Sequence, residues 1–168
     1  MKLLLFRHGP AADRVAWRAT GKEDFLRPLT PDGRARTRAS AKGLHRVVDS
    51  PAAIATSPFA RATQTADVLA RVFGAEAPEE LRALAPDAEP AELLPWLMPR
   101  ASLDLVALVG HEPHLGRLAS WLLTRSEGSF LEFKKGGACL LDLGDRPRPG
   151  GARLLWMLAP AQLRRLGR

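Results

Sequence analysis

The most informative stretch of the chain is Lys2-Leu3-Leu4-Leu5-Phe6-Arg7-His8-Gly9. Its first part is a short apolar run, typical of a strand buried on both faces. The run ends at Arg7 and His8, so a cation and an imidazole stand at the carboxyl end of the strand. Ligands of open α/β sheets bind at that edge, arginine matches phosphate oxygens, and neutral histidine is nucleophilic. The stretch therefore predicts phosphate bound beside a nucleophile, although so short a motif also occurs by chance.

Length and composition indicate one globular domain over residues 1–168. The chain is 46% hydrophobic, which is ordinary for a protein with a substantial core. No apolar stretch approaches the roughly 20 residues of a membrane-spanning helix, so we expect a soluble, cytoplasmic protein. The single cysteine, Cys139, excludes an internal disulfide and a cysteine-based metal cluster. Because it lies in the apolar run Ala138–Leu141, we expect a buried, inert thiol.

The formal net charge of +7 raises the question of a nucleic-acid partner. The 25 Lys and Arg residues are dispersed along the sequence, and they do not alternate with aromatic residues as in single-strand binders. We therefore expect neither a nucleic-acid nor a membrane partner, and we interpret the charge as an attraction for phosphorylated or acidic substrates. No pattern specifies the oligomeric state, and a monomer is the default expectation.

Two segments carry the same helix-start signal, a hydroxyl residue followed by proline. Thr30 and its proline predict a helix from residue 31 to about residue 48, and Ser57 and its proline predict a helix over 58–73. Arg61 lies in the first turn of the second helix, beside its positive end. A cation is unfavourable there, so an anion should compensate it.

The remaining segments alternate between strand and helix patterns. The strongest strand pattern covers residues 103–109 and ends at Gly110, His111 and Glu112, before a helix over 113–123. The other expected elements are a polar loop after residue 10, strands over 51–56 and 81–84, a helix over 90–98, a hairpin of 138–143 with 153–158, and a short helix from residue 160.

Three strand ends thus offer groups suited to one anion: Arg7 with His8, then Arg61 in the helix that follows, then His111. If these strands are parallel neighbours, the groups converge on one pocket. The two arginines would clamp phosphate oxygens, one histidine would attack phosphorus in line, and the other would stabilise the equatorial oxygens. Fixed cations carry the charge in this scheme, so we expect no metal and no other cofactor.

Three ordered motifs resemble the histidine phosphatase superfamily, also called phosphoglycerate mutase-like. Arg7-His8-Gly9 matches its first hallmark, residues 57–65 match the pattern S-P-x-x-R-[AT]-x-x-T, and Gly110-His111 matches a later strand end. The resemblance spans nearly the whole chain. Similarity to the short bacterial SixA-type phosphohistidine phosphatases extends to the segments Arg27–Thr30, Phe133–Gly137 and Trp156–Pro160. It implies a single-domain three-layer α/β/α sandwich with a mostly parallel central sheet.

The resemblance also implies a metal-independent phosphatase with a phosphohistidine enzyme intermediate. His8 would be the nucleophile, the two arginines would bind phosphate, and His111 would stabilise the transferring group. From residue chemistry, we expect Ser57 to cap its helix rather than bind substrate. Thr65, one turn beyond Arg61, is expected to hydrogen-bond within the motif.

The resemblance does not identify a general acid. Phosphate monoesters leave as alkoxides and benefit from a carboxylic acid donor, and Glu112 is the candidate because it follows His111. SixA-type proteins often lack an obvious acid, which suits a phosphohistidine whose imidazole leaves neutral. We interpret the carboxylates of the middle segment as surface charges: Glu79, Glu80, Asp87 and Glu89.

The function expected from these features is removal of phosphate from phosphohistidine in proteins. The alternatives are a broad-specificity phosphatase of sugar, nucleotide or cofactor phosphates and, in another class, a non-catalytic phosphate-binding module. Residues 74–103 are too few for a large lid, so an open pocket would admit a phosphohistidine that protrudes from a protein. Lys134 and Lys135 at the rim would favour acidic partners, although a solvated pair is the simpler interpretation.

Overall fold

The computed structural model describes residues 1–126 and 128–168. In these residues one six-stranded sheet has the order β3-β2-β4-β1-β5-β6. The first four strands in that order are parallel, and β5 and β6 are antiparallel to their neighbours. The strands are β1 (Lys2–Arg7), β2 (Ala53–Thr56), β3 (Glu79–Glu80), β4 (Leu105–Gly110), β5 (Ala138–Asp142) and β6 (Arg153–Leu158). The α-helices are α1 (Arg14–Ala19), α2 (Pro31–Leu44), α3 (Ala60–Phe73), α4 (Leu94–Leu97), α5 (His114–Thr124) and α6 (Pro160–Leu166).

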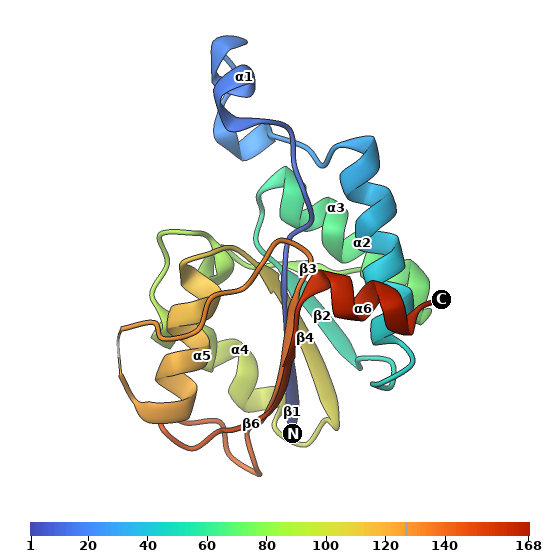
Figure 1. The fold of residues 1–168 in the computed structure, drawn as a ribbon. Coiled ribbons are helices and arrows are strands. Elements are labelled where there is room, and N and C mark those ends of the chain that lie inside the picture. The colour runs from blue at the N-terminus through green and yellow to red at the C-terminus, as the bar shows by residue number, and fades with distance from the viewer. Residues whose placement is uncertain (127) are drawn as a thin grey trace.

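Helices cover both faces of the sheet, with α2, α3 and α6 on one face and α4 and α5 on the other (Figure 1). The central strand β1 is buried on both sides. Its residues Leu3 and Leu5 join the core beneath α5, whereas Leu4 and Phe6 join the core beneath α2, α3 and α6. This explains the unbroken apolar run at the start of the sequence. The predicted three-layer α/β/α fold and the predicted hairpin of β5 and β6 are confirmed.

The strand ends meet as the sequence analysis expected. Strands β2, β4 and β1 are adjacent and parallel, with Thr56 and Phe6 both in register with Val109. The residues that follow these strands therefore emerge side by side at one edge of the sheet. That edge carries His8, Ser57 and His111.

The largest departure from the predicted elements is the polar loop, which folds into an arm. The arm comprises residues 11–29, contains α1 and a 3-10 turn at Asp24–Leu26, and projects from the body of the molecule (Figure 1). An antiparallel bridge between Ala11 and Leu29 closes its base. The Asp13 carboxylate caps α1 by accepting the N–H groups of Val15 and Ala16. None of the α1 residues is buried, so the segment has no apolar periodicity from which a helix could be predicted.

Three smaller predictions were wrong. The strand expected over 81–84 is instead β3 at Glu79–Glu80 followed by a 3-10 turn at Arg82–Leu84. The helix expected over 90–98 is divided into a 3-10 turn (Pro90–Leu93), α4 and a second 3-10 turn (Met98–Arg100), because its prolines lack the N–H that a continuous helix needs. The helix expected to reach residue 48 ends at Leu44 and continues as turns. No described helix has the length and apolarity to cross a membrane.

Candidate active site

His8 follows β1 and has a defined tautomer. Its Nδ1 lies 2.7 Å from the carbonyl oxygen of Gly9, which can only accept, so Nδ1 carries the proton and Nε2 keeps its lone pair. Burial lowers the pKa of His8 to about 3, and the charges of Arg61 and Arg7 act in the same direction, whereas the Gly9 hydrogen bond opposes them. The imidazole is therefore neutral at physiological pH, with a nucleophilic nitrogen available.

Gly9 and Thr65 join the His8 loop to α3. The Gly9 N–H donates to Thr65 Oγ1 over 3.0 Å, and that hydroxyl donates to the Arg61 carbonyl over 2.7 Å. The predicted hydrogen bond of Thr65 within its motif is thus confirmed, and it reaches the first motif as well. A Cβ atom on Gly9 would lie 2.0 Å from Thr37 Oγ1, which is why only glycine fits here.

Arg7 and Arg61 point their guanidinium groups at the same edge of the sheet as His8. Nη1 of Arg7 donates to the Phe133 carbonyl. Nη1 and Nη2 of Arg61 bind Asp24, at 2.9 Å to its carbonyl and 3.0 Å to its carboxylate. Burial is the largest influence on the pKa of both guanidinium groups and lowers it, yet arginine remains a cation at any physiological pH.

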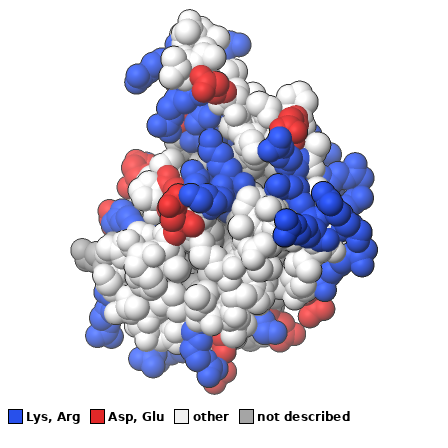
Figure 2. All heavy atoms as spheres, viewed as in Figure 1, with Lys and Arg blue, Asp and Glu red and all other residues white. Residues whose placement is uncertain are grey.

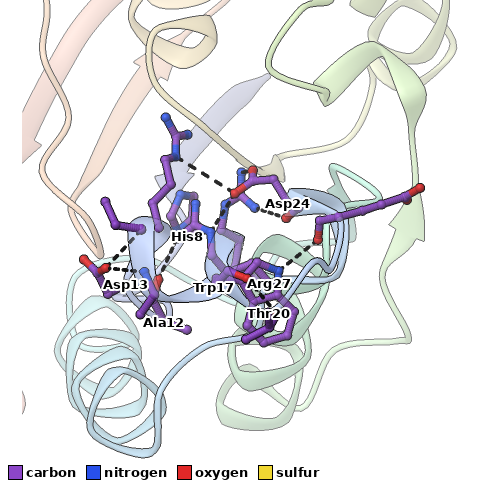
Figure 3. A network of polar contacts seen from close by, with 12 residues as sticks. His8, Ala12, Asp13, Trp17, Thr20, Asp24 and Arg27 are labelled. Atoms are coloured by element: carbon purple, nitrogen blue, oxygen red, sulfur yellow. Dashed lines mark hydrogen bonds and ion pairs between the residues drawn. The ribbon is translucent and has the colours of Figure 1, made fainter.

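The arm contributes residues to the site that the sequence analysis did not assign. Asp24 lies between Arg61 and Arg27, and its Oδ1 accepts from Arg27 Nε over 2.7 Å (Figure 3). The Arg27 side chain is buried and also donates to the Ala12 carbonyl. The ring of Phe25 packs 5.2 Å from that of Phe59. The one sequence feature that pointed to this part of the arm was the similarity of the segment Arg27–Thr30 to SixA-type proteins.

His111 follows β4 and faces His8, with 5.0 Å between the ring centroids. Its Nε2 lies 2.8 Å from Ser57 Oγ. That hydroxyl oxygen also accepts from the Phe59 N–H, so its own proton is free for Nε2, and the imidazole proton then resides on Nδ1. Burial, followed by the nearby His8 and Arg61, lowers the pKa of His111 to about 2.

The prediction that Ser57 caps α3 was wrong. The residue that precedes the helix is Phe59, which has no side-chain cap. Two residues separate Ser57 from the first turn of α3. Its hydroxyl is therefore too far from the helix to cap it, and it bonds His111 instead. The matching prediction for Thr30 is confirmed, because Thr30 Oγ1 accepts from the Gly33 N–H over 2.8 Å.

Glu112 lies beside Arg7 and anchors a loop. Its Oε1 accepts from the Phe133 N–H over 2.7 Å. Burial raises the pKa of the Glu112 carboxyl, whereas hydrogen bonds from Phe133 and Gly116 and the charge of Arg7 act in the opposite direction. The same loop carries Lys135, whose pKa is lowered mainly by burial.

These groups surround one hollow of about 540 Å³ beneath the arm. All five predicted site residues line it, together with others from the arm and loops: Arg7, His8, Ala11, Ala12, Asp13, Arg14, Arg27, Arg61, Pro86, His111, Glu112 and Lys135. The acidic residues of the middle segment do not line it; Asp87 and Glu89, for example, pair with Arg82 and Arg117. Lys134 pairs with Glu132, so only one of the two rim lysines faces the hollow.

Three buried nitrogen atoms of residues lining this hollow make no hydrogen bond within the described chain. They are Nε of Arg7, Nε of Arg61 and Nδ1 of His111. Buried donors are rarely left unpaired in proteins. The hollow itself is lined by two arginines and two histidines, so it has the chemistry of a phosphate site next to a nucleophile.

Residues 3–85 match the family model described as histidine phosphatase superfamily (branch 1). An uncharacterized protein of Picosynechococcus sp. (strain PCC 7002) is 38% identical over 159 residues, covering 92% of this chain and 88% of that protein.

Solved structures show the same fold. The protein histidine phosphatase SixA complexed with tungstate superposes with a TM-score of 0.83 at 24% identity, covering 97% of this chain and 99% of SixA. A phosphoserine phosphatase mutant from Entamoeba histolytica superposes with a TM-score of 0.69 at 17% identity, covering 96% and 98% of the two chains. Together with the matched motifs, these findings establish that the chain is a phosphatase and belongs to the histidine phosphatase superfamily.

Proposed function

We propose that the chain removes phosphate from phosphohistidine side chains of proteins through an intermediate phosphorylated on His8. The observation that carries this proposal is that Arg7, Arg61 and His111 line one hollow with His8, whose Nε2 keeps its lone pair. A phosphoryl group in the hollow would offer its oxygens to Arg7, Arg61 and His111 while its phosphorus faces the nucleophile.

The reaction proceeds in two displacements. Nε2 of His8 attacks phosphorus in line, and the bond between phosphorus and the substrate imidazole breaks. Water then attacks phosphorylated His8, which releases inorganic phosphate and returns the neutral imidazole. The two arginines balance the charge on the equatorial oxygens in both steps, so the positive charge is supplied by the chain itself. The Nδ1–H bond to Gly9 holds the ring and stabilises the charge that it gains when phosphorylated.

The carboxylates of the hollow favour a leaving group that needs no acid. Asp13 accepts two backbone N–H groups at the start of α1. Glu112 accepts the Phe133 N–H and is occupied in holding a loop. A phosphohistidine whose second nitrogen is protonated departs as neutral imidazole, whereas an alkyl phosphate departs as an alkoxide that must be protonated. The neighbouring SixA is described as a protein histidine phosphatase, which agrees with this preference.

Hydrolysis of small phosphate esters is the second candidate, and Glu112 favours it. Its raised pKa is the property that a proton donor needs, and it lies in the hollow beside Arg7. The structurally similar phosphoserine phosphatase acts on such an ester. Glu112→Gln retains an acceptor for the Phe133 N–H and removes the acid. A loss confined to an alkyl phosphate would identify Glu112 as the donor, whereas equal losses on alkyl phosphate and phosphohistidine would limit it to holding the loop.

The test is a substrate panel with wild type and His8→Ala in the presence of a chelator. The panel contains a phosphohistidine-bearing protein, p-nitrophenyl phosphate, and sugar and nucleotide phosphates. We expect the highest kcat/KM on the phosphohistidine protein and no turnover by His8→Ala. Faster turnover of small esters would contradict the substrate assignment. Phosphate binding without turnover of any compound would favour a binding module instead.

A further inference from the structure

The positive charge of the chain is gathered on one face of the fold. The cations are dispersed along the sequence, but seven of them converge where α2, α3 and α6 meet. We call this set the basic face: Arg34, Arg38, Lys42, Arg46, Arg71, Arg164 and Arg168. Figure 2 shows Lys and Arg side chains crowded over α2 and α6, on the right, and a second group around the hollow below the arm.

The basic face is continuous with the active site. Lys135 lines the active-site hollow and also a small hollow of about 130 Å³ that includes Arg164. Arg164 lines the next hollow, of about 680 Å³, with the exposed α2 residues Arg34 and Arg38. These two in turn line a groove of about 750 Å³ between α2 and α3. Neighbouring hollows that share Lys135, Arg164 or Arg34 and Arg38 therefore connect the rim of the active site to the cations of α2.

The charges of the basic face are not balanced within the described chain. None of its seven members forms an ion pair there. Arg34, Arg38 and Lys42 are exposed and spaced four residues apart, which brings like charges together on one helix face and opposes helix formation. An arrangement that costs the fold stability and extends outward from the active site points to an anionic partner.

The partner is larger than a metabolite, because no small phosphate ester reaches from His8 to the far end of α2. Successive cations on α2 are about 6 Å apart along the helix axis. Carboxylates four residues apart on a partner helix have the same axial spacing. The four hollows are lined by aliphatic residues such as Ala35, Val68 and Val72, and by no Phe or Trp on which bases could stack. The chemistry of this surface therefore suits an acidic protein helix better than a nucleic acid.

We propose that the basic face docks an acidic helix of the phosphoprotein substrate while its phosphohistidine occupies the active site. This inference rests on the proposed function and specifies its substrate as an acidic protein domain. Charges at the rim of an interface raise the rate at which enzyme and substrate associate, and salt screens this effect.

The test uses two synthetic helical peptides that carry a phosphohistidine near one end. One has glutamate at every fourth position, and the other has glutamine there. We expect wild type to hydrolyse the glutamate peptide with a kcat/KM about tenfold higher at low ionic strength, and this advantage should vanish in high salt. The variant Arg38→Glu/Lys42→Glu/Arg168→Glu should lose the advantage while retaining full activity on free phosphohistidine.

A matched variant controls for net charge. Arg125→Glu/Arg146→Glu/Arg148→Glu makes the same change at exposed residues that line none of the four hollows, and it should behave as wild type. Melting curves verify that both variants are folded.

Equal kcat/KM on both peptides would overturn the docking proposal and leave the proposed function intact. Turnover of p-nitrophenyl phosphate without turnover of either peptide would overturn both. Salt-dependent binding of a labelled single-stranded oligonucleotide, lost in the first variant and without any peptide preference, would assign the basic face to nucleic acid and overturn the proposal.

Discussion

Replacing Thr65 by valine isolates the hydrogen bond that ties the His8 loop to α3. Valine keeps the shape of threonine but cannot accept the Gly9 N–H, which Thr65 Oγ1 accepts over 3.0 Å in a fully buried position. A buried donor left without a partner costs about 1–3 kcal/mol, and we expect the free energy of unfolding to fall by that amount. The Arg61 carbonyl is less affected, because it is also a helix acceptor.

The effect on catalysis should exceed the effect on folding. Gly9 orients His8 through its carbonyl, so a shift of this glycine displaces Nε2. A displacement of about 1 Å in a reacting group lowers the rate by about 100-fold, so we expect kcat to fall by up to about 100-fold. Urea denaturation and steady-state turnover of p-nitrophenyl phosphate measure the two quantities. Thr65→Ser is the control, since it keeps both hydrogen bonds and loses only a methyl group, at about 1 kcal/mol. Equal losses of kcat in both variants would refute the hydrogen-bond explanation.

Three further predictions concern buried groups. Ser57→Ala leaves Nε2 of His111 unpaired, so kcat/KM for p-nitrophenyl phosphate should fall by about tenfold or more; wild-type kinetics would contradict the role of Ser57. Burial lowers the pKa of His114 to about 4, whereas an unfolded histidine binds a proton below about pH 6.5, so stability falls as the pH decreases. In urea denaturation, the free energy of unfolding of His114→Leu should therefore fall by about 2 kcal/mol less than that of wild type between about pH 7 and pH 5. An equal fall in both proteins would disprove this. Burial raises the pKa of Cys139 to about 12, so iodoacetamide should leave the native enzyme active, and rapid inactivation would show an accessible thiolate.

The features that could be predicted from the sequence are those that local pattern determines. The apolar run before Arg7 and His8 indicates a strand covered on both faces, and β1 is buried in that way. The position of His111 at a strand end, and of Arg61 in the first turn of the helix that follows β2, fits the same pattern, since parallel neighbouring strands end at one edge. The convergence of these residues could therefore be expected from the sequence.

The arm and the role of Ser57 could not be predicted, because both depend on contacts between distant segments. The α1 helix buries no residue, and its connection to the site runs through Asp24 and Arg61, which are 37 residues apart. Ser57 has the same local pattern as Thr30, yet its hydroxyl lies against a histidine 54 residues away. The basic face is a third case, because its members come from α2, α3, α6 and the residues that follow α2 and α6, which only the fold brings together.

Trapping the enzyme intermediate tests the central claim most directly. Wild type is mixed with a phosphohistidine peptide carrying radiolabelled phosphate, quenched in alkali within the first turnover, and mapped by mass spectrometry; His8→Asn is treated in parallel. The account predicts phosphate bound to His8, stable in alkali and lost in acid, and no labelled protein in His8→Asn. Label on His111, or continued turnover by His8→Asn, would contradict the assignment of His8 as the nucleophile.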